Sequence, residues 1–226
     1  MVRTGKDALR PDFAIGKRIL DCGFAFWISQ IAMGFIALVY NGQLGKYGGD
    51  VAISVYAVIS SVMTFVIMPA SGISQGIQPI LGFNYGSGHG ERVKKVMIQA
   101  TALSVGVTVV IWAIAQMAPA AIIRMFGGEE ELLQIGVPAL RANFILAPVL
   151  GFVMLATTFF QSIGKPKASS MITLVRQVAA LIPFIYILPM IFGAMGIFYA
   201  QPISDVIATI ISAVLVAKEF RGLSGK

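Results

Sequence analysis

Six long hydrophobic blocks, separated by short polar or charged segments, run along this chain of 226 residues. Each block contains about 20 or more mostly apolar residues, which is the length that an α-helix needs to cross the hydrocarbon core of a bilayer. The predicted membrane-spanning helices are 19–40, 51–82, 96–117, 136–161, 168–191 and 195–217. The pattern therefore predicts an all-α membrane protein with six transmembrane helices in one membrane domain.

Prolines interrupt two of these blocks. The block at 51–82 is longer than a straight span requires, and Pro69 with the glycines that follow it should divide and kink the helix. The fourth block contains Pro138 and Pro148. We therefore expect the second helix to be bent and to continue past the membrane boundary.

Lysine and arginine residues are distributed unequally over the segments between the blocks. Thirteen of the 17 fall in alternate segments, which would lie on one side of the membrane: 1–18, 83–95, 162–167 and 218–226. Only Lys46, Arg124 and Arg141 fall on the opposite side. Because basic loops stay on the cytoplasmic side, we predict a multi-pass protein of the plasma (inner) membrane with both termini in the cytoplasm. The first segment would be a cytoplasmic leader or a linker, and the last a cytoplasmic tail.

The composition narrows the function classes that remain. Hydrophobic residues make up 57% of the chain and charged residues 12%, against about 25% charged in an average soluble domain. The net charge of +7 does not indicate nucleic-acid binding, because the basic residues lie between hydrophobic blocks and not along one face. A single cysteine and a single histidine form no metal-site pattern, and no nucleotide-binding or catalytic motif is present. We therefore expect no enzyme activity, no cofactor and no bound nucleic acid.

Three longer stretches carry a resemblance to a known family. They are GISQGIQPILGFNYGSGHGERVKK at 72–95, FFQSIGKPKASSMITLVRQ at 159–177 and FGAMGIFYAQPISD at 192–205. In residues, order and spacing, the chain resembles the second half of the multidrug and toxic compound extrusion (MATE) transporters. The resemblance implies twelve spans in two six-helix lobes around a central cavity, with antiport of drugs against protons or sodium. This chain would then be the C-terminal lobe, spans seven to twelve.

The resemblance also implies partners. The substrates would be lipophilic or cationic small-molecule drugs, and membrane lipid would surround the helices. A first-lobe polypeptide or a second copy of the chain would complete the cavity, and we expect the lobe by itself not to transport. Sodium-coupled relatives carry an acid on the tenth span, where this chain reads PALRANFILAP at 138–148 without a carboxylate. The coupling ion, proton or sodium, therefore stays open.

Four charged residues in or near the blocks are candidates for coupling or gating. Asp205 lies inside the sixth block, where a carboxylate is either a functional group or a structural partner of a base such as Arg141. Asp21 opens the first block, where it could act with an ion or simply complement the helix N-terminus. Arg176 lies inside the fifth block and would either extend toward the cytoplasmic interface or pair with Asp21.

Embedded amides and soft apolar residues are candidates for the cavity wall. The candidates are Gln30, Gln75, Asn143, Met33, Phe35, Met63 and Met154. Amides in membrane helices also hydrogen-bond between helices, and methionine and phenylalanine also serve as ordinary lipid-facing residues. Both interpretations stay open at these positions.

Two other functions are alternatives to drug efflux. A related flippase-like half that exports lipid-linked oligosaccharides would need several basic residues in its cavity, whereas only Arg141 and Arg176 lie inside blocks. A non-transporting membrane subunit or remnant would act, if at all, by helix association. The presence or absence of a neighbouring reading frame of the first-lobe type would discriminate a split transporter from a remnant.

Overall fold

The computed structural model describes residues 13–127 and 130–223, with side chains from Gly34 onward. The regular elements in these ranges are all helical, which confirms the predicted all-α class. In chain order they are α1 (Phe13–Gly86), α2 (Gly90–Met117), α3 (Pro119–Arg124), α4 (Glu130–Phe144), α5 (Ala147–Ser162), α6 (Pro166–Leu174), the π-helical segment η2 (Val175–Ala180), α7 (Leu181–Phe192) and α8 (Ala194–Leu223).

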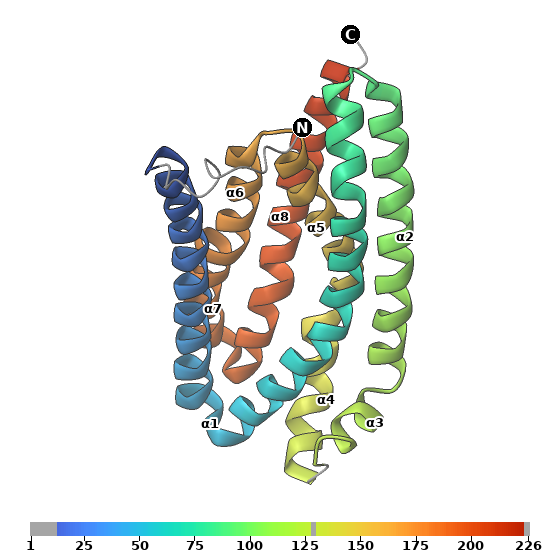
Figure 1. Ribbon diagram of the computed structural model, residues 1–226. Coiled ribbons are helices and arrows are strands. Elements are labelled where there is room, and N and C mark those ends of the chain that lie inside the picture. Colours follow the sequence, from blue (N-terminus) through green and yellow to red (C-terminus); the bar gives the residue numbers. More distant parts are fainter. Residues whose placement is uncertain (1–12, 128–129, 224–226) are drawn as a thin grey trace, which may run out of the picture. The chain divides into compact units, whose positions relative to one another are not determined.

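Helix α1 covers the first two predicted blocks and is interrupted once. Gly49 has φ 62° and ψ −162°, a backbone conformation that favours glycine and separates the two blocks. After this break the helix continues through Pro69 and Pro79, so the second block is not divided. Figure 1 shows that this later part of α1 bends along its length, as the prolines predict.

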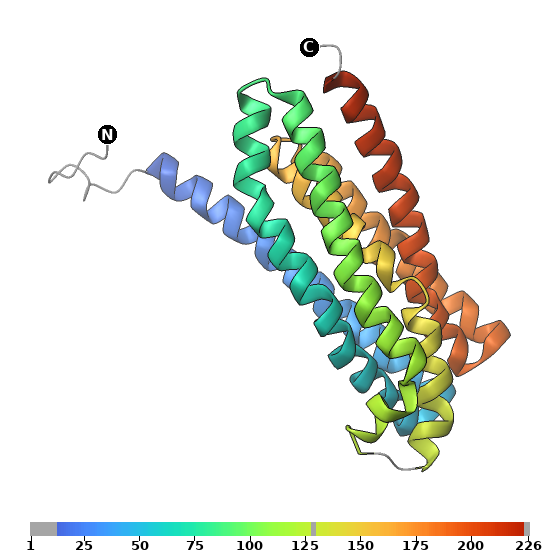
Figure 2. The ribbon, with the colours of Figure 1, turned by 90° about the vertical axis from the view of Figure 1, so that its right-hand side faces the viewer.

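The chain forms two compact units, Met1–Val39 and Tyr40–Lys226. In the first unit, the described part is the N-terminal stretch of α1. The second unit contains the remainder of α1 and all later helices, and everything below concerns this unit unless stated. Its long helices lie side by side with short turns between them (Figures 1 and 2).

Helix α8 runs through the middle of the second unit, in contact with α4, α5, α7 and η2. Helix α2 packs on α5 at a close approach, since a Cβ on Gly151 would lie 2.7 Å from Ser104 Oγ. The main apolar core includes the fully buried Leu155 and Phe159. Burial of these apolar side chains holds the helices together where they face each other.

The helices have the length and apolarity that membrane spans require. Four helices of the described chain qualify, at Gly34–Gly86, Gly90–Met117, Pro166–Phe192 and Ala194–Leu223. Helices α4 and α5 qualify as a fifth span if they are counted together, with a bend of 44° between them. Pro148 explains this bend, because its ring would collide with the carbonyl of Phe144, four residues earlier, where α4 ends. The number six stays a prediction.

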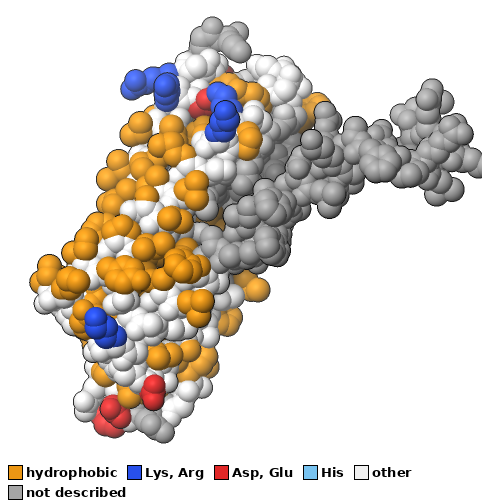
Figure 3. Space-filling model, turned by 90° about the vertical axis from the view of Figure 1, so that its left-hand side faces the viewer, with side chains coloured by type: hydrophobic (Ala, Val, Ile, Leu, Met, Phe, Trp, Pro, Cys, Tyr) orange, Lys and Arg blue, Asp and Glu red, His pale blue; other side chains and the backbone are white. Residues whose placement is uncertain are grey.

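Apolar side chains cover the outer surface. Phe83 is 73% exposed, and Met117 and Met190 are exposed to a similar or greater degree. Figure 3 shows hydrophobic side chains over the middle of one face, with charged side chains gathered toward its two ends. Such an apolar surface would aggregate in water, whereas it is the expected surface of a membrane protein.

Three of the basic segments predicted to share one side of the membrane lie at one end of the unit: 83–95, 162–167 and the described part of 218–226. Tyr85, at the end of α1, donates a hydrogen bond of 3.1 Å to Glu219 Oε1 on α8. Lys165, in the turn between α5 and α6, donates to the other oxygen of Glu219. The start of α2 touches the end of α8, since a Cβ on Gly90 would lie 2.9 Å from the Leu223 carbonyl oxygen. Three segments far apart in the sequence therefore meet at this end.

Candidate functional site

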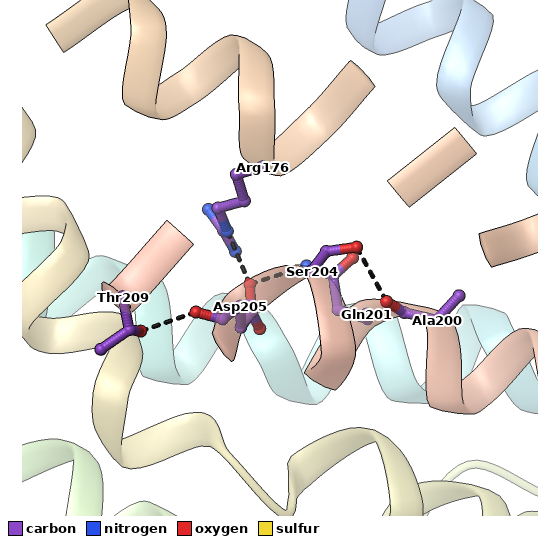
Figure 4. Close-up of polar contacts among 6 residues, drawn as sticks. All are labelled: Arg176, Ala200, Gln201, Ser204, Asp205 and Thr209. Carbon is purple, nitrogen blue, oxygen red and sulfur yellow. Dashed lines mark hydrogen bonds and ion pairs between the residues drawn. The ribbon is translucent and has the colours of Figure 1, made fainter. Parts of the chain in front are cut away.

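The best-defined polar site inside the helices is an ion pair between η2 and α8. The Arg176 Nε atom lies 2.7 Å from Asp205 Oδ1. The Asp205 side chain is 2% exposed and that of Arg176 is 20% exposed. Figure 4 shows Arg176 extending from its own helix toward Asp205 on α8, which also carries the other residues drawn. A carboxylate and a guanidinium are thus brought together between two helices.

The backbone of α8 is unusual on both sides of Asp205. Pro202, three residues before it, has no N–H and interrupts the helical hydrogen bonding. Two hydroxyls bond to carbonyls nearby: Ser204 Oγ donates to Ala200 O at 2.9 Å, and Thr209 Oγ1 donates to Asp205 O at 2.6 Å (Figure 4). These bonds satisfy the two hydroxyl donors, which would otherwise be costly to bury in apolar surroundings.

Arg176 also lies on an irregular backbone. It is the second residue of the π-helical segment η2, which separates α6 from α7 in the fifth predicted span. A π-helical turn is rare, and such turns occur frequently at functional sites because they change the direction in which side chains project. The irregular turn therefore sets the position from which Arg176 reaches α8.

The carboxylate receives its two side-chain hydrogen bonds on one oxygen. Arg176 Nε and Gln201 Nε2, the latter at 3.2 Å, both donate to Asp205 Oδ1. Within the described chain, Oδ2 receives none. Arginine keeps its proton under all physiological conditions, so a change of charge in this pair must come from the carboxylate. Protonation of Asp205 would leave the Arg176 guanidinium, which is 20% exposed, without its counter-charge.

Two aromatic rings, those of Tyr40 and Tyr56, stack on each other in the same unit. Tyr40 is 1% exposed and stacks on Tyr56, with ring centroids 4.6 Å apart and planes inclined by 12°.

The predicted pairing of Asp205 with Arg141 is wrong. Arg141 is exposed on α4, whereas its neighbours Ala142 and Asn143 are buried, so its side chain projects away from the helices that α4 contacts. Its carbonyl accepts a hydrogen bond of 3.0 Å from Gln116 Nε2. The partner of Asp205 is Arg176, and this also replaces the expected extension of Arg176 toward the interface. Asp21, which was the predicted partner of Arg176, lies outside the described side chains.

The cavity candidates occupy different environments. Asn143 is buried, Met63 and Met154 are half-buried, and Gln75 is exposed with its Nε2 donating to Ser71 Oγ at 3.0 Å. Phe35 is exposed in the first unit, and Gln30 and Met33 lie outside the described side chains. No hydrogen bond within the described chain joins any of these residues to the ion pair. Their role in a cavity stays a prediction.

A polar face on α1 was recognised only in part from the sequence. Its exposed or half-exposed hydroxyl and amide residues recur at helical spacing: Ser54, Ser60, Ser61, Thr64, Ser71, Gln75 and Gln78. Several are satisfied within the helix, as Ser61 Oγ donates to Ala57 O and Thr64 Oγ1 to Ser60 O. The spacing of three, four and seven residues is the signal that identifies this face. We refer to these seven residues as the polar face of α1.

The described residues offer no group of three His, Cys, Asp or Glu side chains that could hold a metal ion. The side chains joined at the ion pair are a carboxylate, a guanidinium and one amide.

Comparison with known proteins gives consistent matches. The MatE family matches residues 26–187. Multidrug export protein MepA of Staphylococcus aureus (strain MSSA476) is 24% identical over 208 residues, covering 92% of this chain and 45% of that protein. MepA of Staphylococcus haemolyticus (strain JCSC1435) is 20% identical over 207 residues with the same coverage. The chain therefore spans about half the length of the curated relatives it matches.

Solved structures agree in fold. The outward-facing conformation of a multidrug resistance MATE family transporter of the MOP superfamily has a TM-score of 0.86 and 20% identity, covering 100% of this chain and 51% of that one. The inward-facing conformation of such a transporter has a TM-score of 0.87 and 20% identity, covering 96% and 50%. The resemblance stated from the sequence is thus confirmed, and the fold of the whole chain corresponds to half of these proteins.

Proposed function

The chain belongs to the MatE family, whose members are transporters and not enzymes, and we propose that it forms the second half of a cation-coupled multidrug efflux antiporter. The observation that carries the proposal is the full-length match of this chain to half of transporters known in outward-facing and inward-facing conformations. The three sequence stretches that resemble the second half of the family support its assignment as the C-terminal lobe.

The substrates that we propose are lipophilic or cationic drugs. The support comes from the curated relatives, which are multidrug export proteins. A flippase for lipid-linked oligosaccharides is less well supported, because phosphate recognition needs available basic side chains and Arg176 is already paired with Asp205.

The second half needs a partner, and we propose a first-lobe polypeptide. The polar face of α1 would be costly to expose to lipid along its whole length, although local hydrogen bonds satisfy several of its hydroxyls. A water-filled cavity shared with another lobe would remove this cost. A second copy of the chain would offer the same cover, and the experiment below includes that possibility.

Coupling would use the Arg176–Asp205 pair. In alternating access two conformations exchange around one central site, and an ion gradient drives the exchange only if the two conformations bind the ion differently. A carboxylate that is paired in one conformation and protonated or cation-bound in the other meets this condition. Asp205 is the carboxylate of the described spans that is buried beside a base, and it is our candidate.

We propose that the basic end of the unit, where Lys165 and Glu219 meet, faces the cytoplasm. The support is the charge distribution along the chain, together with the gathering of the basic segments at one end. Both termini would then lie in the cytoplasm of a multi-pass inner-membrane protein.

Efflux of a fluorescent cation such as ethidium from de-energised and re-energised cells tests the proposed function. Cells that express this chain alone should retain the dye like cells with an empty vector, because one lobe supplies only one of the two walls of the proposed transport cavity. Cells that also express a first-lobe polypeptide from the same genome should export it at least about tenfold faster. Immunoblots of membrane fractions control for the amount of each half.

Export by this chain alone would contradict the need for a first lobe and would indicate a functional homodimer. Absence of export when both halves are present in the membrane, across several lipophilic cations, would contradict drug efflux itself.

A further inference from the structure

A cavity of about 680 Å³ lies at the basic end of the second unit, outside the ion-pair site. It is enclosed by the end of α1, the start of α2, the turn between α5 and α6, and the end of α8. Its size falls within the range of ligand pockets, about 300–1,000 Å³. Nothing in the proposed transport cycle uses it.

The polar part of the cavity is basic. Lys165 and Lys218 line it together with a single carboxylate, Glu219. That carboxylate is already engaged, with Tyr85 bonded to one oxygen and Lys165 to the other. The hydrogen bond to Glu219 raises the pKa of the Lys165 ammonium, so this group stays charged at neutral pH. Lys218 is exposed and has no carboxylate partner among the described residues.

The charged residues around the cavity also make this end of the unit positive. The described segments 83–95, 162–167 and 218–223 contain seven lysine and arginine residues against two glutamates. Figure 3 shows that most of the Lys and Arg side chains on that face lie toward one end, with another toward the opposite end. A cationic drug would be repelled here, whereas an anion would be attracted.

The remaining walls are apolar or carry no side chain. Phe160, Leu215 and Leu223 supply hydrocarbon, and Gly86, Gly88 and Gly90 leave the backbone of the turn uncovered. Gly88 has φ 74°, a backbone conformation in which a side chain would be strained. A ligand with an anionic head and a hydrocarbon tail matches this combination better than a purely polar anion does.

We propose that this cavity binds the phosphodiester headgroup of an anionic phospholipid of the cytoplasmic leaflet, with Lys165 and Lys218 donating to the phosphate and the acyl chains lying along Phe160 and Leu215. Basic pockets between membrane helices on the cytoplasmic side are suited to such headgroups. The inference requires the chain to lie in a membrane with this end inward. It does not require the chain to transport a drug.

Glu219 would compete with a lipid phosphate for Lys165, and this competition can be tested. Without lipid, Glu219 holds Lys165; with lipid, the phosphate competes for the same ammonium. Glu219→Gln removes the competing charge and frees Lys165, so it should increase binding of an anionic lipid. If Lys165 and Glu219 served only to join the turn to α8, the same change would weaken the fold without increasing lipid binding.

Native mass spectrometry of the delipidated full chain in detergent tests the proposal, with phosphatidylglycerol, phosphatidylcholine and glycerol 3-phosphate as probes. Phosphatidylglycerol should bind about tenfold more tightly than phosphatidylcholine, and soluble glycerol 3-phosphate should bind only weakly. Lys165→Ala/Lys218→Ala should abolish the preference, and Glu219→Gln should increase it. The matched control, Lys46→Ala/Arg124→Ala, removes two basic side chains from segments outside the cavity and should leave it unchanged.

The single substitution Lys218→Ala serves as a second variant in case the double variant misfolds, because it breaks no described hydrogen bond. It should reduce the preference for phosphatidylglycerol while the circular dichroism of the protein stays the same. Equal binding of the two lipids, or an equal loss in the matched control, would overturn the proposal. If glycerol 3-phosphate binds as tightly as phosphatidylglycerol, the ligand of the cavity is a soluble phosphate and the lipid proposal is overturned.

Discussion

Asp205→Ala should lower the unfolding free energy of the protein by about 3 kcal/mol, the lower end of the cost of removing one partner from a buried ion pair. The substitution leaves the Arg176 guanidinium in apolar surroundings with its counter-charge gone. Arg176 is 20% exposed, which allows some hydration and sets the lower end of the range. Thermal loss of helical circular dichroism in detergent measures the effect.

Two comparisons separate the ion pair from general damage to α8. Arg176→Met/Asp205→Leu removes both charges and should recover most of the loss, because neither group is left uncompensated. Ser212→Ala changes a buried side chain on the same face of α8, two turns away, whose hydroxyl has no partner in the described structure, and it should be neutral or slightly stabilising. A double variant no more stable than Asp205→Ala would show that the pair itself does not matter.

The same carboxylate should decide ion coupling in the assembled transporter. Asp205→Asn keeps the size of the side chain but removes its charge and its ability to exchange a proton. Efflux of a fluorescent cation by the two co-expressed halves should fall about tenfold or more, while Ser212→Ala should leave it within about twofold. Unchanged efflux by Asp205→Asn would exclude Asp205 as the coupling group and leave it a structural role.

Gly196→Ala should be the most damaging change of a single methyl group. A Cβ at Gly196 would lie 2.4 Å from both the carbonyl carbon and the carbonyl oxygen of Leu188, at the turn where α7 meets α8. These are backbone atoms and cannot rotate away, so the turn must open at a cost of about 3 kcal/mol, the upper part of the usual range for overpacking. The α7–α8 turn fixes how α7 and η2 lie along α8, and therefore the substitution should also disturb the Arg176–Asp205 pair.

Gly106→Ala provides the matched control for Gly196→Ala. Gly106 lies within α2, and a Cβ there would meet nothing within 4 Å. Alanine is the better helix former, so this variant should be as stable as the parent or more stable by up to about 1 kcal/mol. Thermal unfolding and expression in membranes compare the two variants. Equal stability of both would contradict the close packing of α7 on α8.

The sequence predicts the helices well because a membrane span has a simple physical requirement, a long apolar run. The blocks at 96–117, 168–191 and 195–217 fall within α2, within α6 to α7 and within α8. The bend between α4 and α5 follows from Pro148, whose effect on a helix is local and known. Features fixed by about 20 neighbouring residues are therefore available without a structure. A single proline is a weaker guide, because the second block continues through Pro69 and Pro79.

The pairing of side chains between helices is a different kind of information. Arg141 and Arg176 both lie in apolar blocks, and the sequence does not show which one faces α8, because apolar residues surround both positions. The rotation of each helix depends on its neighbours, and the π-helical turn at Arg176 has no recognisable local pattern. The polar face of α1, by contrast, follows from residue spacing, and Gln75 was its only member singled out as a cavity candidate.

Export, lipid binding and the partner lobe all require that the chain crosses the membrane with the Lys165–Glu219 end in the cytoplasm. Single cysteines introduced into a Cys22→Ser background test this directly, at Lys167→Cys on the basic end and Arg124→Cys on the opposite end, where both parent residues are exposed. A membrane-impermeant maleimide should label Arg124→Cys on intact cells and should label Lys167→Cys only after permeabilisation. Labelling of Lys167→Cys on intact cells, with Arg124→Cys protected, would contradict this orientation of the chain.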